Sequence, residues 1–190
     1  PLQRFIAATG KPAIIATGMA TLGEVERVVN IYLEEGNLNI VLLHAVSNYP
    51  CSDESLNLRA MHTLAQAFSL PVGFSDHSEG YLGGVLSIAL GAKVIEKHFT
   101  LEKSMAGPDH KASSTPFEFA ELVRNVRRAE QMLGSTRKIC QQEEQQMSMV
   151  SRKSLTLASD IKTGETLKDA DVQLMRPGSG IDASHISSFV

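Results

Sequence analysis

The chain has 190 residues, of which 43% are hydrophobic and 21% are charged, and its formal net charge is −3. This composition is typical of a globular protein with room for one domain and a small second one. The slight negative charge argues against nucleic-acid and membrane-surface partners. No apolar run approaches the ~20 residues that a membrane span needs.

The cysteines and the first residues bear on the cellular context of the chain and on its extent. Cys51 and Cys140 are far apart and form no CxxC pair. They provide no disulfide framework, which fits a reducing cytoplasm. The chain begins at Pro1, within what reads as the end of a helix, and shows neither an initiating methionine nor a signal peptide. We therefore expect a cytoplasmic protein and a polypeptide longer than these residues.

Four strand–helix pairs are predicted in the first two thirds of the chain. Short apolar runs, typical of buried parallel strands, cover residues 13–16, 40–43, 71–74 and 92–95. Helical patterns follow them at residues 21–35, 56–68, 82–90 and 116–133. In the third helix, an apolar stripe is predicted from the helical spacing of Leu82, Val85, Leu86, Ala89 and Leu90.

These repeats predict an α/β fold with a parallel sheet covered by helices. A Rossmann fold would place a glycine-rich turn after its first strand, whereas Gly83-Gly84 falls within a helical pattern. A (β/α)8 barrel takes ~250 residues, so four units in about 130 residues predict half of a TIM barrel.

The remainder of the chain has a different character. Residues 1–133 contain the half-barrel, and residues 134–149 are polar and are predicted to be a linker. Residues 150–190 carry short β-like runs and turn signals, such as Ser154–Leu157 and Arg176-Pro177-Gly178. They predict a small β-rich module.

Polar residues that could do chemistry follow all four predicted strands. They are found at residues 17–19, 44–50, 75–77 and 96–98. The active site of a (β/α)8 barrel is built at the carboxyl ends of its strands. Four such clusters together therefore predict a catalytic face.

Side-chain alternation predicts a metal site on this face. Residues i and i+2 of a strand point the same way, so Ser75 lies with His77 and Glu96 lies with His98. If the shared face is the barrel interior, the two histidines converge there. Two imidazoles with open positions suit a divalent transition ion such as Mn²⁺, and the Glu96 carboxylate can hold a histidine or a metal-bound water.

Other interpretations of these residues stay open. A single histidine after a strand is more often a hydrogen-bonded structural residue, and Glu96 could pair with a barrel lysine. Lys97 points away from the histidines and is expected to be a helix-facing or exposed cation. His110 lies farther along a loop with turn chemistry and is a less favoured third metal ligand.

Taken together, the motifs resemble the sialic acid synthase family, which includes legionaminic and pseudaminic acid synthases. The resemblance runs from about Lys11 to the end of the chain and rests on ATGMA (16–20), LLHAVSNYP (42–50), VGFSDH (72–77), GAKVIEKHFTL (91–101), GPDHKAS (107–113) and RPGSGI (176–181). It implies a C-terminal half-barrel followed by an antifreeze-like (SAF) module.

The resemblance also implies roles for individual residues. His77 and His98 match the metal ligands, with Mn²⁺ the expected ion and Mg²⁺ or Co²⁺ as alternatives. Glu96 matches an active-site carboxylate beside them. Ser75 matches a residue that contacts phosphoenolpyruvate, and Tyr49 matches a tyrosine of the same pocket.

Two further matches concern the sugar and the second subunit. Asp109 matches an aspartate that holds the amino sugar, and Arg176 matches an arginine that the antifreeze-like module extends into the neighbouring subunit. This implies a domain-swapped homodimer. Two positions depart from the family pattern: Ala16 stands where serine is usual, and Ser47 takes the place of an asparagine ligand.

The implied reaction condenses phosphoenolpyruvate with N-acetylmannosamine or a related N-acetylated amino sugar. The ligand histidines must be neutral, so activity is expected to fall at acid pH. One alternative is another phosphoenolpyruvate-dependent synthesis, such as that of a 3-deoxy-sugar-acid phosphate, and another is a non-catalytic half-barrel binding module. We expect residues 1–190 alone to be inactive, because the family's proposed general acid/base and phosphate-binding lysines belong to the other half-barrel.

Overall fold

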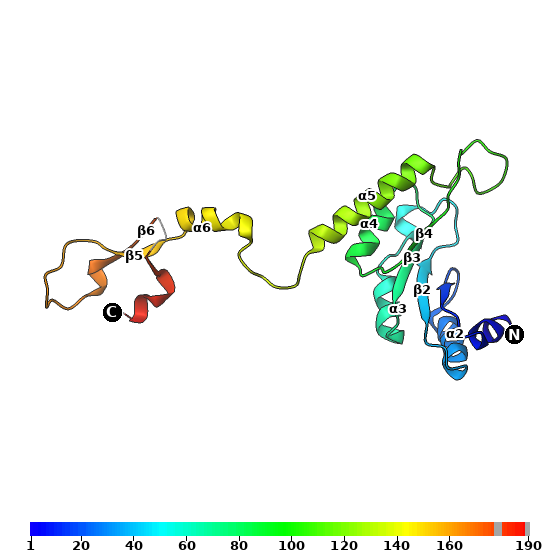
Figure 1. Ribbon diagram of the computed structural model, residues 1–190, viewed down its shortest axis with the longest axis horizontal. Coiled ribbons are helices and arrows are strands. Elements are labelled where there is room, and N and C mark those ends of the chain that lie inside the picture. The colour runs from blue at the N-terminus through cyan, green and yellow to red at the C-terminus, as the bar shows by residue number, and fades with distance from the viewer. Residues whose placement is uncertain (177–179, 189–190) are drawn as a thin grey trace. The chain divides into compact units, whose positions relative to one another are not determined.

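The computed structural model describes residues 1–176 and 180–188. The chain divides into two compact units, Pro1–Gly134 and Ser135–Val190 (Figure 1). Three residues of the RPGSGI motif, Pro177 to Ser179, lie outside the described residues. Each unit is described by itself.

The first unit contains a curled parallel sheet, the half-barrel that the strand–helix repeats predict. Its strands are β1 (Ala13–Ala16), β2 (Ile40–Ala45), β3 (Val72–Asp76) and β4 (Ile95–Lys97), in the order β1-β2-β3-β4. All three strand pairs are parallel. Parallel neighbours need crossover connections, and these connections bring the carboxyl ends of all four strands to one edge of the sheet.

Five helices accompany the sheet: α1 (Leu2–Ala8), α2 (Leu22–Glu34), α3 (Ala60–Phe68), α4 (Leu82–Ala89) and α5 (Pro116–Leu133). α2 begins at a capping box between Thr21 and Glu24. The core lies between helices and sheet, where Leu42, Phe74 and Met61 are buried. Within the part of the chain that the structure describes, no helix is both long enough and apolar enough to cross a membrane.

The predicted boundaries agree with the structure at the first strand and the last helix and differ elsewhere. β4 begins at Ile95 rather than at Ala92. Gly91, with φ +94, turns the chain, and the Lys93 amide donates to the Val72 carbonyl at 2.8 Å before regular pairing starts. Residues 92–94 therefore lead into the strand instead of forming it.

The apolar stripe predicted for the third helix was wrong. In α4 the buried residues are Gly83, Gly84 and Ser87, whereas Leu82 and Leu86 are 57% and 47% exposed. The glycines lie at close contacts that leave no room for a side chain: a Cβ on Gly83 would lie 3.4 Å from Phe74 Cε1 of β3, and one on Gly84 would lie 2.7 Å from Leu122 Cδ1 of α5. Close packing of the helix on the sheet thus selects the small residues rather than the leucines.

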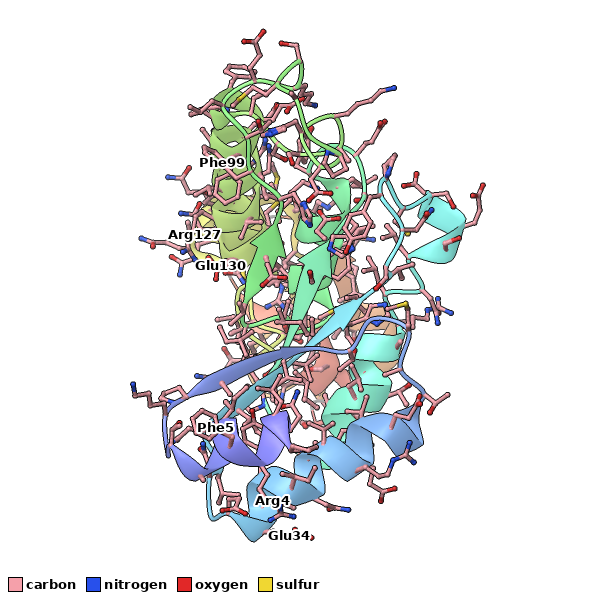
Figure 2. All side chains as sticks on the ribbon, turned by 90° about the vertical axis from the view of Figure 1, so that its right-hand side faces the viewer. Arg4, Phe5, Glu34, Phe99, Arg127 and Glu130 are labelled. Atoms are coloured by element: carbon pink, nitrogen blue, oxygen red, sulfur yellow. The ribbon has the colours of Figure 1, made fainter. Side chains whose placement is uncertain are left out.

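The two edges of the described sheet carry exposed apolar side chains. Phe5 of α1, the helix that precedes β1, is 71% exposed, and Phe99, which lies just after β4, is 55% exposed (Figure 2). Near the β1 edge, Arg4 forms ion pairs with Glu34 and Glu35 at the end of α2. β1 and β4 are the outer strands of the described sheet, and unpaired strand edges favour association with further strands.

The second unit contains a small antiparallel sheet. Its strands are β5 (Ser154–Leu157), β6 (Val172–Met175) and β7 (Ile181–Asp182), in the order β6-β5-β7. Short helices η3 (Asp169–Asp171) and η4 (Ala183–Ser188) accompany it. The segment predicted to be a linker contains η2 (Gln142–Glu144) and most of α6 (Gln145–Ser151). Neither helix has a buried residue, and the apolar side chains of Met147, Met149 and Val150 in α6 are exposed.

The start of α5 makes the stability of the first unit depend on pH. Thr115 and Glu118 form a capping box, and Lys103 Nζ donates to Glu118 Oε1 at 2.6 Å. The hydrogen bond from Lys103, followed by that from the Thr115 backbone, lowers the pKa of Glu118 below its ordinary value of 4.5.

We therefore expect Glu118→Gln to reduce the free energy of unfolding at neutral pH. A carboxylate with a lowered pKa in the folded state stabilises the fold above its unfolded pKa, and this contribution is lost as the pH falls through the lowered value. The effect is modest, because the side chain is 39% exposed and solvent screens the pair. Urea unfolding of both proteins at several pH values checks this, and a difference that does not shrink on acidification would contradict it.

Candidate active site

Ser75 and Glu96 form the base of a polar cluster at the carboxyl ends of β3 and β4. They are register partners in neighbouring strands. The Ser75 hydroxyl donates to Glu96 Oε1 at 2.7 Å, and Ser75 is 2% exposed. The predicted alternation thus brings these two side chains together, and Glu96 pairs with a serine rather than with a lysine.

His77 lies one layer above Ser75, and its tautomer follows from its partners. Its Nδ1 is 2.7 Å from the Val46 carbonyl oxygen, which can only accept, so Nδ1 carries a proton. In the neutral ring Nε2 is then unprotonated. Nε2 lies 3.3 Å from Ser75 Oγ, whose single hydrogen points to Glu96. His77 therefore presents a free lone pair above the Ser75–Glu96 pair.

Three rings meet over this pair. The centroids of His77 and His98 are 5.2 Å apart, with their planes nearly perpendicular. The Tyr49 ring lies 4.2 Å from His77 and 5.1 Å from His98. The structure thus assembles Ser75, His77, Glu96, His98 and Tyr49 from three separate segments of the chain.

The opposite face of the same strands holds a buried ion pair. Lys97 Nζ lies 3.0 Å from Asp76 Oδ2, and the two side chains are 3% and 0% exposed. Lys97 also donates to the Ser78 carbonyl at 2.7 Å. The alternative that Lys97 is an exposed cation was wrong, while its predicted orientation away from the histidines agrees with the sheet alternation.

Sequence reasoning missed this pair, although a signal was present. Asp76 and Lys97 alternate with the histidines, so both had to face the helix layer, where an unpaired charge is costly. Gly83-Gly84 gave the second signal, because a Cβ on Gly83 would lie 3.3 Å from Asp76 Oδ1.

The Cys51 thiol lies near this ion pair. Burial, and then the nearby Asp76 and Asp53 carboxylates, raise the pKa of the thiol.

The ends of β1 and β2 contribute less to the cluster. His44 is buried, and its Nε2 is 2.8 Å from the Leu56 carbonyl oxygen, so it has the structural role common for a histidine after a strand. Ser47 lies against the turn after β1, where a Cβ on Gly18 would be 2.3 Å from Ser47 Oγ. Ala16 ends β1 and offers no hydroxyl.

Asp109 and His110 lie in the loop between β4 and α5. Asp109 is exposed, and its carbonyl accepts from Ser113 Oγ at 2.7 Å. His110 Nδ1 lies 2.7 Å from Thr100 Oγ1, and Thr100 is buried. His110 is therefore engaged in holding the loop together. Arg176 is exposed and directly follows β6 in the second unit.

Within the described residues, no group of three His, Cys, Asp or Glu side chains is arranged to hold a metal ion. The two imidazoles nevertheless fit such an ion as a partial ligand set. Metal-binding histidines almost always donate their second ring N–H to a carbonyl or carboxylate, as His77 does to Val46. Open positions would remain for water and substrate.

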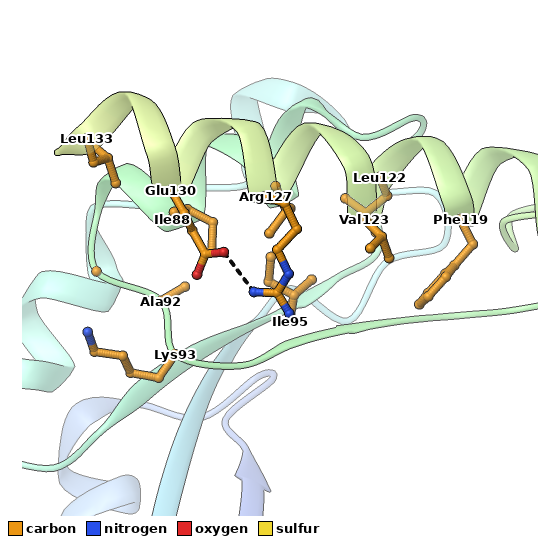
Figure 3. Close-up of a pocket in the computed structure, with 12 residues that line it drawn as sticks. Ile88, Ala92, Lys93, Ile95, Phe119, Leu122, Val123, Arg127, Glu130 and Leu133 are labelled. Carbon is orange, nitrogen blue, oxygen red and sulfur yellow. Dashed lines mark hydrogen bonds and ion pairs between the residues drawn. The ribbon is translucent and has the colours of Figure 1, made fainter.

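A groove of the first unit lies elsewhere, between α4, α5 and the approach to β4 (Figure 3). Its volume is about 420 Å³, and its lining is mostly apolar, with Ile88, Phe119 and Val123 among its residues. Arg127 and Glu130 pair at 2.7 Å within it. Lys93 also lines the groove, but no histidine does, and Glu130, the one carboxylate of the lining, is paired with Arg127, so the groove lacks the chemistry of the histidine cluster.

Comparison with known proteins identifies what the chain resembles. Residues 1–138 match the NeuB family. The chain is 46% identical over 187 residues to the uncharacterized protein MJ1065 of Methanocaldococcus jannaschii, covering 98% of this chain and 56% of that protein. It is 44% identical over 194 residues to the N,N'-diacetyllegionaminic acid synthase of Legionella pneumophila, covering 100% and 54%.

A solved structure agrees with these relatives. The N-acetylneuraminic acid synthetase of Leptospira borgpetersenii, crystallised with citrate, superposes with a TM-score of 0.71 at 36% identity, covering 77% of this chain and 51% of that one. The chain thus spans about half the length of the proteins it matches.

Proposed function

Since the chain belongs to the NeuB family, we propose that it is part of a synthase that condenses phosphoenolpyruvate with an N-acetylated amino sugar, giving a nine-carbon sugar acid and phosphate. One observation carries the proposal. The ring centroids of His77 and His98 lie 5.2 Å apart, above the hydrogen-bonded Ser75–Glu96 pair at the strand ends. The similarity to a diacetyllegionaminic acid synthase supports a sugar with two N-acetyl groups as acceptor, with N-acetylmannosamine as the alternative.

His77 and His98 would hold the divalent ion, for which we propose Mn²⁺, with water and substrate oxygens filling the open positions. When bound, such an ion supplies Lewis-acid polarisation of the acceptor's carbonyl oxygen. The Val46 carbonyl fixes the His77 ring with Nε2 directed at the Ser75–Glu96 side of the cluster. His77 would therefore bind the ion through Nε2 without a change of tautomer.

Ser75 and Glu96 would handle the polar ends of the substrates. The oxygens of phosphoenolpyruvate accept hydrogen bonds, and the Ser75 hydrogen points to Glu96 Oε1. Binding therefore requires this hydrogen to turn toward the substrate, which leaves Glu96 Oε1 free to accept from a sugar hydroxyl. Tyr49 lies beside both imidazoles, and we propose that it lines the same pocket.

The reaction forms a bond between C3 of phosphoenolpyruvate and the carbonyl carbon of the open-chain sugar. Water then adds at C2, and phosphate leaves with cleavage of the C2–O bond. We propose that Asp109 holds the amino sugar and that Ser47 lies in the phosphoenolpyruvate pocket.

The experiment uses the natural polypeptide with phosphoenolpyruvate that carries ¹⁸O at the C2–O bond. We expect phosphate release only when an amino sugar is present, label in the phosphate, and a product whose mass is that of a nine-carbon sugar acid. Phosphate release without sugar would identify a phosphatase, and turnover only of a phosphorylated sugar that carries no N-acetyl group would favour a 3-deoxy-sugar-acid phosphate synthase. Binding of either substrate without turnover would favour a binding module.

We also propose that residues 150–190 begin an antifreeze-like module and that the protein is a domain-swapped homodimer in the cytoplasm. The exposed Arg176 would complete the active site of the neighbouring subunit. A mixture of Arg176→Ala and His98→Ala proteins should then regain part of the activity that each lacks, because one site in a mixed dimer has both residues. Subunit exchange is confirmed by mass spectrometry, and exchange without regained activity would rule out the swapped arm.

A further inference from the structure

The buried Asp76–Lys97 ion pair lies on the face of β3 and β4 opposite the histidines. Its position suggests a role in addition to stabilising the fold. We propose that Asp76 and Lys97 are positioning residues, which fix the spacing of His77 and His98 on the opposite face of the sheet. The inference rests on the proposed function of these two imidazoles as metal ligands.

The pair is located directly next to both histidines in the chain. Asp76 and Lys97 are register partners in the last described pairing of β3 with β4. His77 and His98 each follow one member of the pair by one residue. A shift of one strand relative to the other would therefore change the distance between the imidazoles and would also break the ion pair.

The hydrogen bonds of the pair hold the backbone on both sides of His77. Asp76 Oδ1 accepts from the Ser78 amide at 2.9 Å and from Ser78 Oγ at 2.6 Å. Lys97 Nζ donates to Asp76 Oδ2 and, at 2.7 Å, to the Ser78 carbonyl. The residues before and after His77 are thus tied to each other and to the strand that carries His98.

A third segment completes this arrangement. The Cys51 amide donates to the His77 carbonyl at 2.8 Å, and residue 51 forms a parallel bridge with residue 78. On the helix side, Gly83 closes over the pair, since a Cβ there would lie 2.9 Å from Ser78 Oγ. The turn that carries His77 is therefore enclosed by the segment at residue 51 and by α4. Among the described hydrogen bonds, those of Asp76 and Lys97 are the only ones that charged side chains make to this turn.

Stability alone is a poor reason for such a pair. Exchanging a buried ion pair for apolar residues of similar volume is often neutral or stabilising. Apolar side chains, however, have no directional bonds and would not fix one register. Metal ligands have to be held to within about 0.5 Å of the productive geometry, which is the kind of precision that the four directional hydrogen bonds of the pair can provide.

The test compares the natural polypeptide with its Asp76→Asn/Lys97→Met variant. The asparagine keeps Oδ1 as acceptor for Ser78, and no unpaired charge is left. We expect the variant to fold, by circular dichroism and thermal melting, and to bind Mn²⁺ about 10- to 100-fold more weakly by calorimetry, the loss typical of changes behind metal ligands. Arg127→Met/Glu130→Gln, which removes the exposed pair on α5, is the matched control and should bind Mn²⁺ as the wild type does.

A second readout needs no metal. In crystal structures of the metal-free proteins, the separation of the His77 and His98 rings should change by about 0.5 Å or more in the variant. An unchanged separation with unchanged Mn²⁺ affinity would overturn the inference. If the wild type binds no Mn²⁺, the proposed metal site fails, and the ring separation still decides whether the pair positions the histidines.

Ser78→Ala covers the case in which the double variant does not fold. It removes the 2.6 Å bond from Ser78 Oγ to Asp76 and leaves the ion pair in place. We expect a smaller loss of Mn²⁺ affinity in the same direction, with a displaced His77 ring. Wild-type affinity and geometry in this variant would likewise overturn the inference.

Discussion

Replacing His77 by alanine should abolish metal-dependent condensation while leaving the fold intact. The substitution removes the Nε2 lone pair and one of two imidazoles that lie 5.2 Å apart. We expect kcat/KM to fall by more than about 100-fold, the upper end of the loss caused by changes around metal ligands. The fold should persist because His77 is only half-buried, and water can replace its bond to the Val46 carbonyl.

Steady-state kinetics at saturating Mn²⁺, with circular dichroism of the same samples, measures this effect. His62→Ala is the matched control, since His62 lies exposed on α3. The control should keep wild-type activity. Full activity of His77→Ala would show that His77 is not a metal ligand.

Lys97→Met should destabilise the first unit more than any change of a surface charge. The substitution leaves the Asp76 carboxylate buried at 0% exposure without its cation. Removing one partner of a buried ion pair costs about 3–5 kcal/mol, because the remaining charge is uncompensated. Adding Asp76→Asn to the variant should restore most of the lost free energy of unfolding.

Urea unfolding of the single and double variants measures this loss. Arg127→Met is the matched control, because Arg127 donates to Glu130 on the exposed face of α5, and it should change the free energy of unfolding little. A small loss for Lys97→Met would mean that Asp76 finds another partner or that water reaches the pair.

The four parallel strands were predictable because buried strands are apolar runs. The position of the site was predictable because polar residues follow each of these runs. The period of two placed Ser75 with His77 and Glu96 with His98, and the structure confirms that these four side chains meet. Helix faces were harder to predict. The leucines of α4 gave the stronger apolar pattern, yet Gly83 and Gly84 lie against the sheet.

The buried ion pair was missed, although the alternation of Asp76 and Lys97 with the histidines indicated that both side chains face the helix layer. A lysine after a strand is usually exposed, and only the sheet register shows that Lys97 faces Asp76. The ring of Tyr49 was placed in the site by family resemblance, and its approach to both imidazoles comes from a segment far from either strand in the sequence. Such contacts depend on tertiary structure, which local patterns do not encode.

The central claim is that His77 and His98 form the metal-binding pair of a phosphoenolpyruvate-condensing synthase. The most direct measurement is the release of phosphate from phosphoenolpyruvate by the natural polypeptide, with an N-acetylated amino sugar, before and after removal of divalent metal by a chelator. We predict that release requires both the sugar and the metal and that Mn²⁺ restores it in the wild type but not in His77→Ala or His98→Ala. Sugar-dependent release that persists without metal, or that either variant retains in full, would contradict the claim.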